Sequence, residues 1–192
     1  MKMVQRRWLV LTPCVAMLTI GDYAYSATII QSAVNPANLH TYHALVADDG
    51  FSGITATDAE TFALTMGGHL ATINDAAEDA WALTTFHQFY LWIGLNDVAQ
   101  EGQFEWYSGE PVTYTKWAPG EPNDFGGIED WVHYYNFGGG DFEFKWNDNA
   151  NLDSIGGSAT SALVEIVPEP SSLVLTIVGL LGLTACRWRP KR

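Results

Sequence analysis

The feature that most limits the fold of this chain is a stretch from Asn96 to Glu129 that holds few strand signals. Glycine, proline and acidic residues are frequent in it. An irregular segment of this length is uncommon inside a domain unless it has a function of its own. The rest of the chain must therefore supply a scaffold that carries one long loop, and something must order that loop.

Two helices are predicted before the loop. Thr55 and Asp58 have the spacing of a helix cap, and the helix that they begin is expected to run to Met66, where two glycines end it. Asn74 is predicted to cap a second helix that continues to about Phe86.

Short strands make up most of the remaining scaffold. Residues 28–40 are interpreted as a polar lead-in. Strands are predicted at Thr41–Val46, His69–Ile73, Leu91–Leu95, Phe104–Trp106, Tyr114–Trp117, Trp131–Tyr135, Phe142–Trp146 and Leu163–Val167. Two early helices followed by many short strands indicate a single α+β domain.

Carboxylate and amide oxygens gather at three places in and after the loop. These places are Glu121-Pro122-Asn123, Glu129-Asp130 and Trp146-Asn147-Asp148. Oxygen ligands without His or Cys suit a hard cation such as Ca²⁺. A carboxylate only accepts hydrogen bonds, whereas an amide also donates them, so a calcium ion lined by such pairs can hold two neighbouring sugar hydroxyls. The leading hypothesis is calcium-dependent carbohydrate binding, in which the ion also orders the loop.

The N-terminal region has the pattern of a segment that is removed. Residues 1–26 combine early cations, an apolar run from Trp8 to Ile20 and small residues at Ala24–Ala27, which predicts a signal peptide. The exported domain would then span residues 27–167.

The C-terminal region, residues 168–192, has a Pro-Glu-Pro triplet, an apolar run from Leu173 to Cys186 and four closing cations. A core helix is the alternative interpretation, but such a helix should show a polar face. The order of parts resembles the PEP-CTERM sorting tail of Gram-negative bacteria. That resemblance implies export, transient membrane anchoring, cleavage by an exosortase-type enzyme, and a place at the cell surface or in exopolysaccharide.

Charge and cysteine content narrow the function further. Residues 27–167 hold only Lys116 and Lys145 against 20 acidic residues, a net charge of about −18. Nucleic acid is therefore excluded as an expected partner, because phosphate contacts need cations. Cys14 and Cys186 both lie in the segments predicted to be removed, so the exported domain would contain no disulfide.

The chain resembles the C-type lectin domain over about residues 41–167. Residues 59–73, which include Gly67-Gly68-His69-Leu70-Ala71-Thr72-Ile73, are similar to the family's first helix and following strand. Trp92-Ile93-Gly94-Leu95 is similar to its central strand motif, and the three oxygen clusters are similar to its principal calcium and sugar site.

The resemblance implies roles for individual residues. The principal calcium ion and the sugar would be bound by Glu121, Asn123, Glu129, Asn147 and Asp148. An auxiliary calcium ion would be bound by Asp97, Glu101, Asp124, Glu129 (through its backbone) and Asp130. Pro122 would follow a cis peptide bond. Glu-Pro-Asn resembles the family's version for diols of the mannose, glucose or fucose type.

The chain also departs from the family pattern. The four usual cysteines fall on Ala63, Trp131, Asn151 and Val164, so neither disulfide can form and the loops depend more on packing and calcium. The segment from Tyr134 to Lys145 is longer than usual and could reshape the sugar site.

Other interpretations remain open from sequence alone. The tryptophans at 92, 106, 117 and 146 are expected in the core, and His69 and His133 are expected to be ordinary strand residues. The domain could bind protein, with calcium only ordering its loops. Paired carboxylates could also hydrolyse polysaccharide, but calcium would occupy the same carboxylates, so an enzyme is not expected.

Overall fold

The computed structural model describes residues 27–48, 52–86, 90–135, 144–155 and 158–168. One mixed sheet forms its centre, with strand order β1-β2-β10-β4-β6-β7, while β3 pairs with β10 and β5 pairs with β4. Its strands are β1 (Ala27–Val34), β2 (Thr41–Ala47), β3 (His69–Leu70), β4 (Leu91–Asn96), β5 (Glu105–Trp106), β6 (Trp131–Tyr135), β7 (Lys145–Asn149) and β10 (Ser161–Ile166). The short strands β8 (Ser154–Ile155) and β9 (Ser158–Ala159) pair separately. Together with two helices, this sheet confirms the predicted α+β class.

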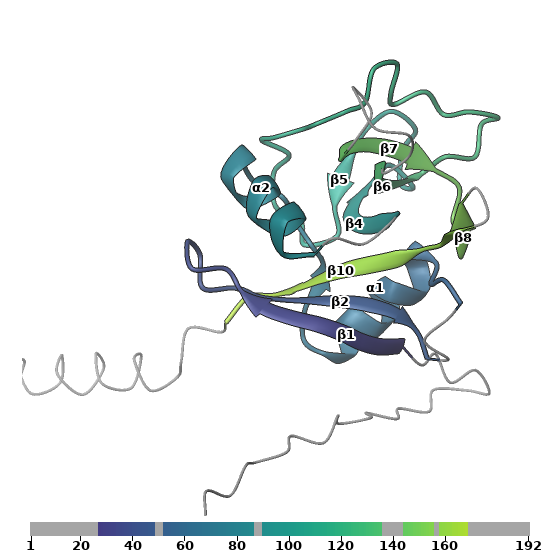
Figure 1. The fold of residues 1–192 in the computed structure, drawn as a ribbon. Helices are drawn as coiled ribbons and strands as arrows, with labels where there is room; N and C mark the ends of the chain where they lie inside the picture. The colour runs from purple at the N-terminus through teal and green to yellow at the C-terminus, as the bar shows by residue number, and fades with distance from the viewer. Residues whose placement is uncertain (1–26, 49–51, 87–89, 136–143, 156–157, 169–192) are drawn as a thin grey trace, which may run out of the picture.

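Most of the ladders are antiparallel, and β10 with β4 is the parallel pair among those described. The chain enters the long loop after β5 and returns to the sheet at β6. In Figure 1 this loop, drawn in teal, extends across the top of the molecule, away from the edge formed by β1 and β2. The sheet therefore carries the candidate binding residues at one end.

The first helix, α1 (Ala56–Thr65), begins and ends as predicted. The hydroxyl of Thr55 accepts a hydrogen bond from the N–H of Asp58 at 3.1 Å, which satisfies one free donor of the first turn. At the other end, Gly67 has a φ of 78°, a conformation that glycine adopts at little cost. The N–H of Gly68 then donates to Ala63 O at 3.1 Å and closes the helix.

The second helix, α2 (Ala76–Thr85), is capped by Asp75, so the predicted cap at Asn74 was wrong by one residue. The Asp75 carboxylate accepts from the N–H groups of Ala77 and Glu78, at 2.8 and 2.9 Å. Asn74 makes a different contact with the helix, because its backbone N–H donates to Glu78 Oε2 at 2.7 Å. The predicted end near Phe86 is confirmed.

The two helices cover opposite faces of the sheet. Successive side chains of β10 point to opposite faces, so neighbouring residues of this strand pack against different helices. Val164 packs in one apolar cluster with Ala59 and Ala63 of α1. Its neighbour Leu163 packs in the other cluster with Ala82 of α2. Three of the four tryptophans predicted as core, Trp92, Trp106 and Trp146, are buried, and Trp117 is half-buried against the same cluster as Trp146.

Several strand predictions need correction. Residues 28–34, interpreted as part of a polar lead-in, belong to the edge strand β1. This strand pairs with β2 through a register shift between Ile29 and Gln31, and its isoleucines Ile29 and Ile30 are exposed. The predicted strand at Tyr114–Trp117 is reduced to one bridge between Trp117 and Trp146. Smaller differences occur in the strands predicted at 69–73, 104–106 and 163–167, while Trp131–Tyr135 is confirmed in full. Of the strand predicted at 142–146, the first two residues lie outside the described part of the chain, and the last two begin β7.

Other contacts replace the absent disulfides at the four positions where the resemblance would place cysteines. Ala63 and Val164 are both fully buried and share one apolar cluster. The indole N–H of Trp131 donates to Tyr107 Oη at 3.0 Å. The amide of Asn151 donates to Thr57 Oγ1 at 2.7 Å. Packing and side-chain hydrogen bonds thus join these positions to the rest of the domain.

The predicted terminal segments are largely outside the part of the chain that the structure describes. This applies to residues 1–26 and, from residue 169 on, to the predicted sorting tail. The glycine run at 138–140 also lies outside the described residues. Among the residues that are described, no helix has the length and apolar character to cross a membrane.

Candidate functional site

Backbone hydrogen bonds bring the long loop against β7 at the residue before Asn147-Asp148. The N–H of Trp146 donates to Lys116 O and the N–H of Ala118 donates to Trp146 O, both at 2.8 Å. The N–H of Glu121 then donates to Ala118 O at 3.0 Å. Two segments far apart in the sequence therefore meet where the predicted ligands lie.

Asp148 joins the two halves of the predicted principal site. Its carboxylate accepts hydrogen bonds from the N–H of Asn123 at 3.0 Å and from the N–H of Asp124 at 2.8 Å. The Asn123 amide in turn donates to a carboxylate oxygen of Glu121. The peptide bond between Glu121 and Pro122 is cis, as the resemblance implied. Glu121, Asn123 and Asp148 thus form one hydrogen-bonded group.

A tight turn between Asp124 and Glu129 connects Glu129 to this group. Its Oε2 atom accepts from the N–H of Phe125 at 2.8 Å, and its own N–H donates to Asp124 Oδ1 at 3.2 Å. Gly126 and Gly127 both have positive φ angles, 81° and 72°, which the turn requires. The turn leaves Phe125 and Ile128 exposed at 78% and 60%.

Asn147, the fifth predicted ligand of the principal site, is nearly buried. Its amide nitrogen lies 2.6 Å from Asp148 O and 3.3 Å from Nε2 of His133. His133 is a fully buried strand residue, as expected, and Nδ1 lies 2.9 Å from Tyr134 O. Burial lowers the pKa of His133 to about 4, so the ring is neutral at physiological pH. A neutral ring with a proton on Nδ1 accepts from the Asn147 amide, and this contact was missed from the sequence.

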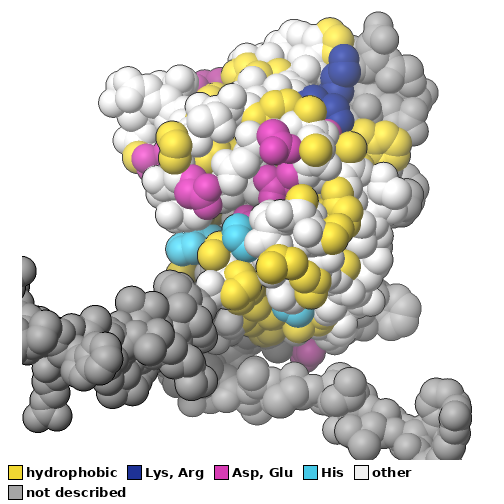
Figure 2. All heavy atoms as spheres, turned by 90° about the vertical axis from the view of Figure 1, so that its left-hand side faces the viewer, with side chains coloured by type: hydrophobic (Ala, Val, Ile, Leu, Met, Phe, Trp, Pro, Cys, Tyr) yellow, Lys and Arg dark blue, Asp and Glu magenta, His cyan; other side chains and the backbone are white. Residues whose placement is uncertain are grey.

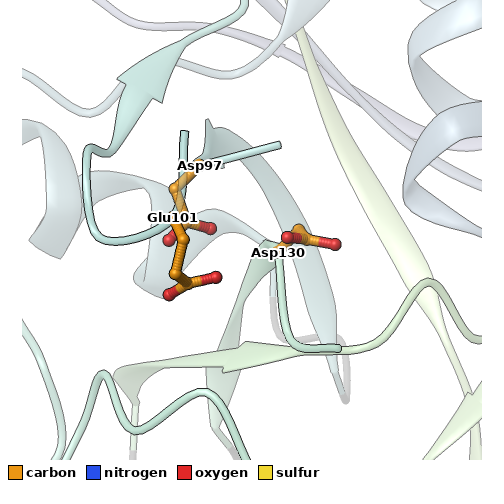
Figure 3. Close-up of side chains that lie close together, drawn as sticks. All are labelled: Asp97, Glu101 and Asp130. Atoms are coloured by element: carbon orange, nitrogen blue, oxygen red, sulfur yellow. The ribbon is translucent and has the colours of Figure 1, made fainter. Parts of the chain in front are cut away.

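Three of the predicted auxiliary ligands form a compact carboxylate group. Asp97, Glu101 and Asp130 each offer an oxygen, and these oxygens lie within 4.8 Å of one another. Figure 3 shows Asp97 and Glu101 on the loop after β4, with Asp130 beside them at the start of β6. The N–H of Asp97 donates to Asp130 O at 3.1 Å, which fixes this approach. Asp124, the fourth side chain of the prediction, is not part of this compact group. Desolvation, followed by the negative charges of Asp97 and Asp124, raises the pKa of Glu101.

One oxygen in the auxiliary group is buried without a partner. Asp97 is 1% exposed, and its Oδ2 atom accepts from the N–H of Gly102 at 2.8 Å. Its Oδ1 atom has no hydrogen-bond partner among the described residues. A buried charged oxygen without a partner is costly, and a bound cation would satisfy it.

The electrostatics of both groups favour a cation. Burial, followed by the negative charges of Asp148 and Glu129, raises the pKa of Glu121 to about 7. Burial and neighbouring carboxylates also raise the pKa values of Glu129 and Asp97. Carboxylates gathered without compensating cations resist ionisation together, and a divalent ion removes that repulsion. The oxygen-only donor set fits Ca²⁺.

The sequence of this chain matches a known family. The family described as the lectin C-type domain matches residues 52–154, which is more than half of the chain. An alpha-N-acetylgalactosamine-specific lectin of Patiria pectinifera is 42% identical over 89 residues, covering 43% of this chain and 51% of that protein. A perlucin-like protein of Mytilus galloprovincialis is 31% identical over 106 residues, covering 52% of this chain and 65% of that protein. The chain thus spans less than two thirds of either relative.

Solved structures agree with the fold. The C-type carbohydrate-recognition domain of cow CD23, determined in the presence of a GlcNAc2Man3 oligosaccharide, has a TM-score of 0.54 and 25% identity. The match covers 68% of this chain and 89% of that domain. Sequence and architecture lead to the same result, and the chain belongs to the C-type lectin domain family.

Proposed function

We propose that this domain binds carbohydrate through calcium, with the sugar held at Glu121, Asn123, Glu129, Asn147 and Asp148. The observation that carries the proposal is the meeting of the Glu-Pro-Asn loop with β7, where Asp148 accepts from the backbone of Asn123 and Asp124. Proteins of the family bind carbohydrate, generally with calcium, and the family fold is non-enzymatic.

The preferred ligand in this proposal is a sugar with a diol of the mannose, glucose or fucose type. Glu121 supplies acceptors only, whereas the amide of Asn123 supplies donors as well. A pair of neighbouring hydroxyls can then donate to one side chain and accept from the other while both oxygens contact the ion. The amide of Asn123 donates to Glu121, which places the donor and the acceptor side by side.

A second calcium ion is proposed at Asp97, Glu101 and Asp130, with Asp124 and the Glu129 backbone. The unpartnered buried oxygen of Asp97 supports this site. Its role would be to hold the loop after β4 against the start of β6. The bound ion would compensate the negative charge of these carboxylates.

Retention on immobilised mannan tests the proposal. The purified protein should bind in the presence of calcium and elute with a chelator or with free mannose. The Asp148→Ala variant should pass through the column, and Glu110→Gln is a matched control because Glu110 is an exposed acid that contacts Asn74 rather than the calcium ligands. Retention that a chelator does not reverse would contradict the proposal.

The alternative is a protein-binding or adhesion module in which calcium only stabilises the loops. The exposed Phe125 and Ile128 beside the principal site favour this candidate, because exposed apolar side chains are common at protein contacts. In that case calcium would raise the melting temperature while mannan and free sugars would not bind.

The cellular setting is also a proposal. Residues 1–26 would direct export, and residues 168–192 would act as a PEP-CTERM tail that an exosortase-type enzyme removes. The domain would then reside at the surface or in the exopolysaccharide of a Gram-negative bacterium. Fractionation of cells with and without the last 25 residues tests this part, since loss of the tail should release the protein into the medium.

A further inference from the structure

Trp146, the residue before Asn147-Asp148, is flanked by two segments. On one side, β6 pairs with β7 and places Tyr134 opposite Trp146. On the other side, Lys116 and Ala118 exchange two backbone hydrogen bonds with Trp146, both at 2.8 Å. Trp146 is therefore held between β6 and the segment that leads to Glu121.

Side chains from both flanks meet on one buried carboxylate of α2. The hydroxyl of Tyr134 donates to Asp79 Oδ1 at 2.8 Å, and the ammonium group of Lys116 forms an ion pair with Asp79 Oδ2. Asp79 is 2% exposed. Both of its oxygens are thus used, one by each flank of Trp146.

Basic residues such as Lys116 are scarce in the domain. Lys116 and Lys145 are the only Lys or Arg residues between positions 27 and 167. Dark-blue Lys side chains occupy one small area of the face shown in Figure 2, close to acidic side chains. In a strongly acidic domain, one of the two basic side chains is therefore paired with this buried carboxylate.

We propose that Asp79 is a positioning residue for the calcium site, acting through Tyr134 and Lys116 on the two flanks of Trp146. The proposal rests on the proposed calcium-binding function. Among the described residues, Asp79 forms no hydrogen bond or ion pair with a predicted ligand. It fixes the register between the loop at Lys116–Ala118 and β7, and this register sets the distance between Glu121 and Asn147-Asp148.

The sequence of contacts explains why α2 would influence the ion. From Lys116 the chain reaches Ala118, whose carbonyl accepts from the N–H of Glu121 at 3.0 Å. From Trp146 the chain passes directly to Asn147. A shift at Trp146 therefore moves both halves of the site relative to each other. Replacing a residue that hydrogen-bonds a metal ligand typically costs about 10–100-fold in metal affinity. Asp79 acts one contact further from the ligands, so we expect an effect at the lower end of this range.

The test compares two buried carboxylates of the purified protein. Asp79→Asn keeps the shape of the side chain and removes its charge. We expect its calcium dissociation constant, measured calorimetrically below the melting temperature, to rise by about tenfold or more. Glu60→Gln is the matched control, because Glu60 is also buried and accepts from His69 at 2.6 Å and from the N–H of Leu70 at 2.7 Å. This control should lose stability but keep the calcium affinity of the wild type.

A second readout separates positioning from simple stabilisation. If Asp79 positions the site, the calcium-loaded form of Asp79→Asn loses more stability than its calcium-free form, because weaker binding adds to the loss. Equal losses in both forms, together with an unchanged dissociation constant, would overturn the proposal. Absence of calcium binding in the wild type would instead refute the proposed function.

A milder variant keeps the test decisive if Asp79→Asn does not fold. Tyr134→Phe removes only the hydrogen bond to Asp79 Oδ1 and leaves the ion pair with Lys116 in place. Its calcium dissociation constant should rise severalfold. An unchanged constant in a folded Tyr134→Phe protein would count against the positioning role.

Discussion

The carboxylate of Asp148 lies 3.0 Å from the backbone nitrogen of Asn123 and accepts its hydrogen bond, which joins β7 to the Glu-Pro-Asn loop. Asp148 therefore has a structural role within the domain as well as its proposed role as a ligand. The same carboxylate also accepts from the N–H of Asp124. Replacing Asp148 would therefore disturb both the Glu-Pro-Asn loop and the proposed ion site.

Replacing Asp148 with alanine should abolish calcium-dependent sugar binding. The variant loses a predicted ligand and leaves the N–H groups of Asn123 and Asp124 without their acceptor. We expect calcium affinity to fall by more than about a hundredfold, since loss of a direct ligand exceeds the usual loss from an outer residue. Calorimetric titration of calcium checks this, with Glu110→Gln as control. Full retention of affinity would show that the principal site lies elsewhere.

Exchanging donor and acceptor in the loop should change sugar preference. In the double variant Glu121→Gln with Asn123→Asp, the amide and the carboxylate trade places, so their mutual hydrogen bond can still form in the reverse direction. We expect mannose binding to weaken relative to galactose binding. The measurement is competition by both free sugars for a labelled glycan. Each single variant is a control for general damage, and an unchanged ratio in the double variant would exclude this pair as the selector.

Neutralising Asp97 should stabilise the calcium-free protein and reduce the stability that the protein gains from calcium. Burial, followed by the charges of Asp130 and Asp148, raises the pKa of Asp97, so its ionised form is unfavourable without a cation. The Asp97→Asn variant should therefore melt at a higher temperature than the wild type in a chelator. In calcium it should gain less stability than the wild type. Thermal unfolding in both conditions tests this, and an undiminished calcium response would remove Asp97 from the auxiliary site.

Glu78 should make part of the folding stability depend on pH. Burial raises its pKa, and the negative charge of Glu165 adds to this effect. A raised pKa means that the folded protein holds a proton that the unfolded chain releases. The stabilising contribution is thus full below the ordinary glutamate pKa of about 4.3 and is lost as the pH rises through the raised value.

The Glu78→Gln variant removes this proton exchange. Urea unfolding between about pH 4 and about pH 8 should show the stability of the wild type falling relative to the variant as the pH rises. Comparing the two proteins at each pH removes the part of the pH dependence that they share. A constant difference between the two proteins across the range would contradict the assignment.

Local patterns predicted much of the scaffold because they depend on neighbouring residues. The cap at Thr55, the glycines after α1 and the strand Trp131–Tyr135 are all local features, and the structure contains each of them. The cap at Asn74 was wrong because an aspartate one residue later competes for the same N–H groups. The edge strand β1 was missed because its apolar residues are partly exposed and do not alternate in the usual way.

Contacts across the fold explain what the sequence could not predict. Lys116 and Asp79 are separated by 37 positions, and no pattern links them before the loop is placed against β7. The contact of His133 with Asn147 likewise depends on the register between β6 and β7. The ligands of the principal site could be proposed from the sequence because they lie in three short clusters, whereas the residues that support them are dispersed.

The most direct test of the account is a two-step calorimetric titration of the purified protein, first with calcium and then with methyl α-mannoside. The account predicts saturable calcium binding, followed by saturable sugar binding that disappears when calcium is chelated. Calcium binding without any sugar response would leave a loop-stabilising ion and support the protein-binding alternative. A protein that takes up no calcium would contradict the central claim.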